Sequence, residues 1–135
     1  AKDKDFLEVV LVTLILFYIE VLKNNIQMLK KLCGQIRKAG GKVFLAHLYL
    51  YSLDNPIEYL EELVKANIID GVETYYPRFT KEQVKTLEDF CEKHKVFMSG
   101  GSDCHGTKNP MKVGTGLNNN LNISEEVVKP WINNN

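Results

Sequence analysis

The fold of this chain is decided by Gly40-Gly-Lys-Val-Phe-Leu-Ala-His47, a near-continuous apolar run that follows two glycines. Runs of this kind, in which apolar and polar residues do not alternate, are typical of strands covered on both faces, as in parallel sheets. We therefore predict a strand over residues 42–47. His47 would stand at its C-terminal end.

Helical and strand-like segments alternate on both sides of this run. Residues 24–39 carry apolar side chains with a period near 3.6 and lysines on the opposite face, and Gly40 and Gly41 would end that helix. The predicted order is helix 24–39, strand 42–47, helix 56–67 beginning at Pro56, strand 68–74, a helix opened by the capping-box pair Thr80 and Gln83, strand 96–98, and a short helix from Ser124 to about Pro130. This alternation predicts an α/β fold with parallel strands and right-handed crossovers.

Composition narrows the class of protein. A length of 135 residues suits a single domain with a real core. The 17 basic and 17 acidic residues balance, so no long-range field favours nucleic acid, a membrane or an acidic partner. The three cysteines are an odd number without a C-x-x-C pair, which argues against a disulfide framework. We expect a reducing, cytoplasmic setting.

The N-terminal segment is the compositional exception. Only Glu8 and Glu20 interrupt the apolar run Phe6–Leu22, and its uncharged part is too short to span a membrane. The preceding Lys-Asp-Lys-Asp is not the basic start of a signal peptide. We predict a buried strand or helix, with membrane association as the alternative. Residues 1–22 are thus an apolar segment of unassigned role, and residues 23–135 form the α/β portion.

Polar side chains stand where three predicted strands end: His47, Glu73, and the pair Asp103 and His105. In parallel α/β folds, functional residues gather at the carboxyl ends of strands. Asp-x-His is a spacing of metal ligands, because an extended backbone points side chains i and i+2 to the same side. The alternative is an exposed turn with an incidental histidine. Three polar signals at one edge favour a metal site.

Further candidates lie close to these strand ends. Arg78 and Lys108 are candidate phosphate contacts, since arginine can grip a phosphate with two donors and lysine acts as a point charge. Each also fits an exposed residue that only favours solubility. Four tyrosines either stack on a nucleobase or cover the rim of the sheet, namely Tyr49, Tyr51, Tyr75 and Tyr76.

Four motifs in order carry a resemblance to a known family. They are Gly40–His47, Asp70-Gly-Val-Glu73, Gly100-Gly-Ser-Asp-Cys-His-Gly106 and Val113-Gly-Thr-Gly116. Together they resemble the C-terminal half of PHP-domain metal-dependent phosphoesterases, over roughly residues 24–132. Within that family they are most similar to the branch of nucleoside 3′,5′-bisphosphate phosphatases and short-oligonucleotide exonucleases. The resemblance implies part of a distorted (β/α)7 barrel that holds divalent ions: Mn, Fe, Zn or Mg.

The resemblance also assigns roles to residues. His47, Asp103 and His105 would be metal ligands, and Asp103 and His105 would carry the catalysis. Glu73 matches a glutamate of this branch that supports the ligands or organises the loop without binding metal directly. The implied activity is hydrolysis of a phosphate ester in a nucleotide, another phosphorylated small molecule or a short oligonucleotide.

The sequence departs from the family pattern in its N-terminal ligands. The His-x-His motif, a further histidine and a bridging glutamate of the family have no counterpart here. His94, the one remaining histidine, is better explained as the charged end of a helix. Leu48 replaces a usual proline, and Cys104 replaces a usual aromatic residue.

These departures leave three interpretations of the chain. It is a fragment of an enzyme, or a complementing chain supplies the missing ligands, or it is a non-catalytic PHP remnant that acts as a binding or scaffolding domain. Half a barrel would expose an apolar face, which the segment Phe6–Leu22 would cover within one chain or across a homodimer.

Overall fold

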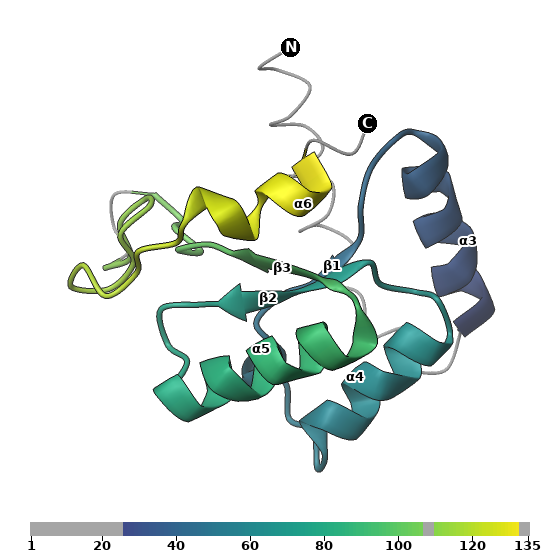
Figure 1. Ribbon diagram of the computed structural model, residues 1–135, viewed down its shortest axis with the longest axis horizontal. Helices are drawn as coiled ribbons and strands as arrows, with labels where there is room; N and C mark the ends of the chain where they lie inside the picture. Colours follow the sequence, from purple (N-terminus) through teal and green to yellow (C-terminus); the bar gives the residue numbers. More distant parts are fainter. Residues whose placement is uncertain (1–25, 107–109, 133–135) are drawn as a thin grey trace.

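The computed structural model describes residues 26–106 and 110–132 (Figure 1). The predicted apolar segment over residues 1–22 and the candidate Lys108 lie outside these ranges. The described elements are, in order, α3 (Ile26–Lys38), β1 (Phe44–Leu45), the 3₁₀ helix η1 (Leu48–Leu50), α4 (Pro56–Lys65), β2 (Gly71–Tyr75), α5 (Lys81–His94), β3 (Phe97–Gly100), the 3₁₀ helix η2 (Glu125–Val127) and α6 (Lys129–Ile132).

The sheet confirms the predicted α/β class. Its three strands are parallel and stand in the order β1-β2-β3. Phe44 pairs with Gly71, and Val72 pairs with Met98. Helix α4 lies between the first two strands in the chain and α5 between the second and third, as expected for parallel crossovers. The described residues show this three-stranded sheet and not the closed (β/α)7 barrel that the resemblance implies.

The two faces of the sheet are covered differently. Helices α3, α4 and α5 share the main core with the inward side chains of the strands, and α6 lies on the other side of the sheet (Figure 1). On that other side, the Trp131 ring packs on Phe44 at a centroid distance of 4.7 Å. The Trp131 indole N–H also donates to the Met98 carbonyl oxygen at 2.9 Å. Alternation along β2 directs Thr74 towards α5, so Glu73 points to the α6 side.

Several strand boundaries differ from the prediction. β1 is limited to two residues, and β2 begins at Gly71 after the buried Ile68 and Ile69. β3 runs through Ser99 and Gly100, which we had assigned to the loop. A Cβ at Gly100 would lie 2.6 Å from Cδ1 of Ile123, so this glycine continues the strand where a larger residue would clash.

The helix boundaries follow the predicted signals, apart from the last. α3 ends before Gly40, whose φ of 87° needs a glycine. Thr80 and Gln83 form the predicted capping box of α5. The predicted helix start at Ser124 is confirmed, because Ser124 caps η2. The predicted end near Pro130 is wrong, because Pro130 lies near the start of α6. Proline is tolerated there because the first helical N–H groups have no partner within the helix.

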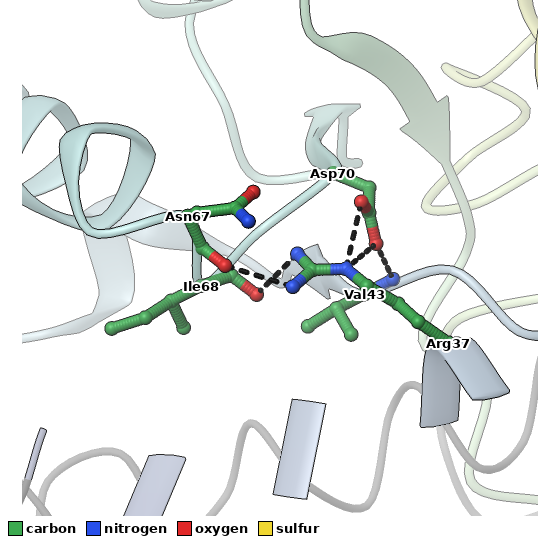
Figure 2. A network of polar contacts seen from close by, with 5 residues as sticks. All are labelled: Arg37, Val43, Asn67, Ile68 and Asp70. Carbon is green, nitrogen blue, oxygen red and sulfur yellow. Dashed lines mark hydrogen bonds and ion pairs between the residues drawn. The ribbon is translucent and has the colours of Figure 1, made fainter. Parts of the chain in front are cut away.

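A polar network joins α3 to the start of the sheet (Figure 2). The Arg37 guanidinium donates to both carboxylate oxygens of Asp70, at 3.1 and 3.2 Å. Its other nitrogens donate to the carbonyl oxygens of Asn67 (2.8 Å) and Ile68 (3.0 Å). The Asp70 carboxylate also accepts the N–H of Val43 at 2.7 Å. The network therefore links α3 with the segments that lead into β1 and β2.

No helix in the described ranges is long and apolar enough to cross a membrane. The longest of them, α5, has 14 residues and carries charged side chains along its length. The apolar run Phe6–Leu22, on which the alternative of membrane association rests, lies outside these ranges.

We predict that Asp70→Ala lowers the free energy of unfolding by about 2–3 kcal/mol, since several hydrogen bonds to a charged, partly buried group are lost together. Urea unfolding measures the change. Asp89→Ala is the matched control, because it removes an exposed carboxylate that pairs with Lys85 within α5. Its loss should stay within about 0.5 kcal/mol. Equal losses in the two variants would contradict a structural role for Asp70.

Candidate functional site

His47 lies beyond the end of β1 in an unusual backbone conformation. Its φ of 30° and ψ of 55° fall in the left-handed region, and it directly precedes η1. Its backbone N–H donates to Oε2 of Glu73 at 2.7 Å. A non-glycine residue in this region is strained and needs support from its surroundings. Here Glu73 supplies that support, which fits its predicted role of organising the loop.

Glu73 is the most strongly perturbed carboxyl group of the site. Burial raises its pKa from 4.5 to about 7. The hydrogen bond from the His47 N–H acts in the opposite direction, and the negative charge of Asp103 adds to the increase. The position of a Cβ on Gly101 would be 3.5 Å from Oε1 of Glu73, so the loop after β3 passes close to this carboxyl. β2 continues to Tyr75, so Glu73 lies within the strand and not at its end, as had been expected from the sequence. Its carboxyl accepts the N–H of His47 beyond the end of β1 and lies close to the loop after β3.

Tyr76 joins two of the predicted site residues. Its hydroxyl donates to Oδ2 of Asp103 at 3.0 Å, and its ring centroid lies 5.7 Å from that of His47. Burial and then the hydrogen bond to Asp103 raise the pKa of Tyr76 to about 12. Sequence reasoning placed Tyr76 among rim or stacking residues and missed this contact. The position of Tyr76 close to the end of a predicted strand was the sequence feature that could have indicated a place in the site.

The imidazole of His47 lies among aromatic rings. The ring centroid of Tyr51 is 5.6 Å away, close to the distance of Tyr76. Nδ1 of His47 is buried and has no hydrogen-bond partner among the described residues. A buried polar atom without a partner is costly, and an imidazole nitrogen is a frequent metal ligand.

Asp103 and His105 do not have the geometry assumed from the sequence. Asp103 has a φ of 52°, so the backbone is not extended and the same-side argument was wrong. The His105 Nδ1 lies 2.7 Å from the backbone oxygen of Asp103 and 3.7 Å from its Oδ1. The His105 side chain is 69% exposed. Its ring therefore contacts Asp103 itself, and its Nε2 is the nitrogen left for a ligand.

The donors that are brought together fit one side of a metal site. His47 offers an unpaired buried nitrogen, and Asp103 offers an anionic oxygen held by the same tyrosine that packs on His47. Within residues 26–106 and 110–132, no three histidine, cysteine, aspartate or glutamate side chains converge well enough to hold an ion. The assignment of His47, Asp103 and His105 as one ligand set remains a prediction.

The other candidates are placed as follows. Arg78 is exposed, and its charge lowers the pKa of the Tyr76 hydroxyl against the larger opposing effects. Tyr49 packs edge-on against Phe79 at a centroid distance of 5.2 Å. His94 ends α5, where its ring stacks on Phe90 at 4.2 Å and its Nε2 lies 3.7 Å from Oε1 of Glu61.

A pocket adjoins the site and shares Tyr76 with it. Its volume is about 270 Å³, slightly below the usual range for whole ligands. It lies between the segment from β2 to α5 and the segment that precedes η2. Its lining residues are Tyr75, Tyr76, Pro77, Phe79, Lys81, Val84, Asn120, Leu121, Asn122 and Ile123.

Comparison with known proteins supports the fold. No protein-family profile matches the chain, and no curated protein matches it. A solved structure that does match is a candidate metal-dependent phosphoesterase from Bifidobacterium adolescentis, at 24% identity and a TM-score of 0.59. The two proteins share a fold. The match covers 77% of this chain and 35% of that one, so this chain spans about a third of the length of that protein.

The raised pKa of Glu73 predicts a specific pH dependence of stability. A folded pKa of about 7 against 4.5 means that the folded state holds this proton more tightly, so stability is lost as the pH rises between the two values. The loss reaches about 3 kcal/mol above pH 7. The amide in Glu73→Gln cannot ionise, so this variant should lack the loss of stability between pH 5 and pH 8. Urea unfolding at pH 5 and pH 8, with a chelator present, measures the difference.

The control for this prediction is Glu82→Gln, which alters an exposed carboxyl in the first turn of α5. This variant should retain the wild-type difference between pH 5 and pH 8. If Glu73→Gln also retained it, the carboxyl of Glu73 would ionise normally in the folded protein.

Proposed function

We propose that this chain carries part of the active site of a metal-dependent phosphoesterase of the PHP type. The observation that carries the proposal is that Glu73, within β2, lies close to His47 beyond the end of β1 and to Asp103 beyond the end of β3. Tyr76 contacts two of these residues. The shared fold with a candidate metal-dependent phosphoesterase supports the same reaction class.

The proposed ligands are His47 and Asp103, with His105 as the third. Mixed nitrogen and oxygen donors suit Mn, Fe or Zn better than Ca. Bound divalent ions would activate water for attack on phosphorus and stabilise the charge of the leaving oxygen. The chain itself contributes the neutral imidazoles, the Asp103 carboxylate and the support of the His47 backbone by Glu73.

The remaining ligands of such a site are proposed to come from residues outside this sequence. The family's His-x-His motif has no counterpart among the 135 residues, which contain three histidines in all. A longer protein that includes this portion, a complementing chain or a second copy would each supply them. The proposed activity therefore belongs to the assembled site.

We further propose a nucleotide or short oligonucleotide phosphate as the substrate. The pocket beside the site supports this choice, because three aromatic side chains line it: Tyr75, Tyr76 and Phe79. Aromatic rings bind bases by stacking, at about 1–3 kcal/mol each. Arg78, exposed near Tyr76, is the proposed phosphate contact in the described residues, and Lys108 is a second candidate.

A second candidate function is a non-catalytic PHP remnant that serves as a binding or scaffolding domain. The observation that favours it is the incomplete donor set within the described ranges. Stable metal binding without hydrolysis, even after a complementing chain is added, would support this function over the first.

We predict that the purified chain binds Mn²⁺ and that Asp103→Asn weakens binding by more than about 100-fold, the upper end of what loss of a supporting contact costs. Elemental analysis after dialysis against Mn²⁺ measures the bound metal, and hydrolysis of an aryl phosphate after addition of a complementing chain measures the activity of the assembled site. His47→Gln should also lose metal. His94→Gln is the matched control, because that ring stacks on Phe90 at the end of α5. Equal metal content in wild type and Asp103→Asn would remove Asp103 from the ligand set.

The pocket leads to a separate prediction about whether the protein prefers a phosphate that carries a base. Asn122→Trp introduces a large ring at an exposed position of the pocket lining and should lower the affinity for a nucleoside monophosphate about tenfold, close to the loss of one stacked base. Glycerol phosphate, which has no ring, should be unaffected. Lys30→Trp on α3 adds the same ring at an exposed position outside the pocket lining. Titration calorimetry compares the variants, and equal losses for both phosphates would argue against a base pocket.

A further inference from the structure

Tyr76 is placed to act on the candidate site from two directions. It directly follows β2 and is only 5% exposed. Its hydroxyl donates to Oδ2 of Asp103 at 3.0 Å, while its ring lies 5.7 Å from that of His47. Phe79 supports the phenol ring from a centroid distance of 5.1 Å. One side chain thus joins two proposed ligands that come from separate segments of the chain.

The carboxylate of Asp103 depends on this contact for its orientation. Residues 101–105 form no regular structure, and Asp103 itself has a left-handed backbone. A carboxylate has two acceptor oxygens, and Tyr76 binds one of them. The other, Oδ1, lies 3.7 Å from Nδ1 of His105, which is beyond hydrogen-bond distance. The bond from Tyr76 therefore fixes Oδ2 and leaves Oδ1 for a cation.

Tyr76 also restricts the His47 imidazole. The ring packs between Tyr51 and Tyr76, at centroid distances of 5.6 and 5.7 Å. Its Nδ1 is buried without a hydrogen-bond partner in the described part of the chain. Contacts with aromatic rings restrict the imidazole without using that nitrogen, which keeps it available as a ligand.

We propose that Tyr76 is a positioning residue of the metal site, which orients the Asp103 carboxylate and the His47 imidazole towards one divalent cation. This role rests on the function proposed above. Groups that orient metal ligands in this way contribute about 10–100-fold in metal affinity. Tyr76 acts through Asp103 and His47 and makes no bond to the metal.

The test is Tyr76→Phe in the full chain, which keeps the ring against His47 and removes only the hydroxyl. Mn²⁺ affinity, measured by electron paramagnetic resonance of the free ion, should fall about 10–100-fold. Tyr59→Phe is the matched control, because this tyrosine lies on α4 and packs against the main core. This variant loses the same group, and its Mn²⁺ affinity should equal that of wild type.

Two further measurements separate positioning from a general structural role. In the Asp103→Asn background, Tyr76→Phe should cause less than a twofold further loss of Mn²⁺ affinity, because the oriented carboxylate is already gone. In the metal-free protein, amide hydrogen exchange of residues 101–105 should quicken in Tyr76→Phe and stay unchanged in Tyr59→Phe. A full additive loss in the double variant, or unchanged exchange, would contradict the proposal.

The outcomes also distinguish this inference from the proposed function. Wild-type binding that Tyr76→Phe leaves intact would overturn the role of Tyr76 and leave the metal site standing. Absence of Mn²⁺ binding in wild type would overturn both. Equal weakening of Mn²⁺ binding in Tyr76→Phe and Tyr59→Phe would assign the effect to the stability of the fold and reject positioning.

Discussion

The hydrogen bonds of Asp70 are the constraint on which the described structure depends. Its backbone N–H donates to the Val43 carbonyl at 2.7 Å, and its own carbonyl accepts the Phe97 N–H at 2.9 Å. Its carboxylate binds the Val43 N–H and Arg37. A residue that hydrogen-bonds the segments entering all three strands fixes the register in which those strands pair. In that register, His47, Glu73 and Gly101 lie close to one another.

The elements of the fold were largely predictable because local chemistry determines them. Three sequence features indicate local structure that the folded protein retains. They are the capping box of Thr80, the glycine at position 40 and the apolar run over 42–47. The strand ends were less predictable, because pairing decides them. Gly100 continues β3 because a neighbouring side chain leaves no room for a Cβ, which no local pattern reveals.

The sequence predicted which residues lie near the candidate site, but it did not predict their backbone conformations or contacts. The sequence predicted that His47, Glu73 and Asp103 lie at strand ends, and the structure brings them close together, although Glu73 lies within β2. The left-handed backbone of His47 and Asp103 could not be predicted, since these residue types adopt that region more often than most but only at a minority of positions, and long-range contacts decide which. The contact of Tyr76 with Asp103 was missed for the same reason, because its partner lies on a separate loop.

The energetic cost of the arrangement of His47, Glu73 and Asp103 bears on the proposed function. Three features of this part of the structure cost folding free energy. They are the positive φ of His47 and Asp103, the burial of the Glu73 carboxyl, and the His47 Nδ1 without a partner among the described residues. A cation between His47 and Asp103 would offset part of that cost, because it would pair with the unpaired nitrogen and with the charges of both carboxylates. The same cation would lower the pKa of Glu73. This offset supports the metal site proposed above, because a purely structural edge would be more stable with a neutral side chain at position 73.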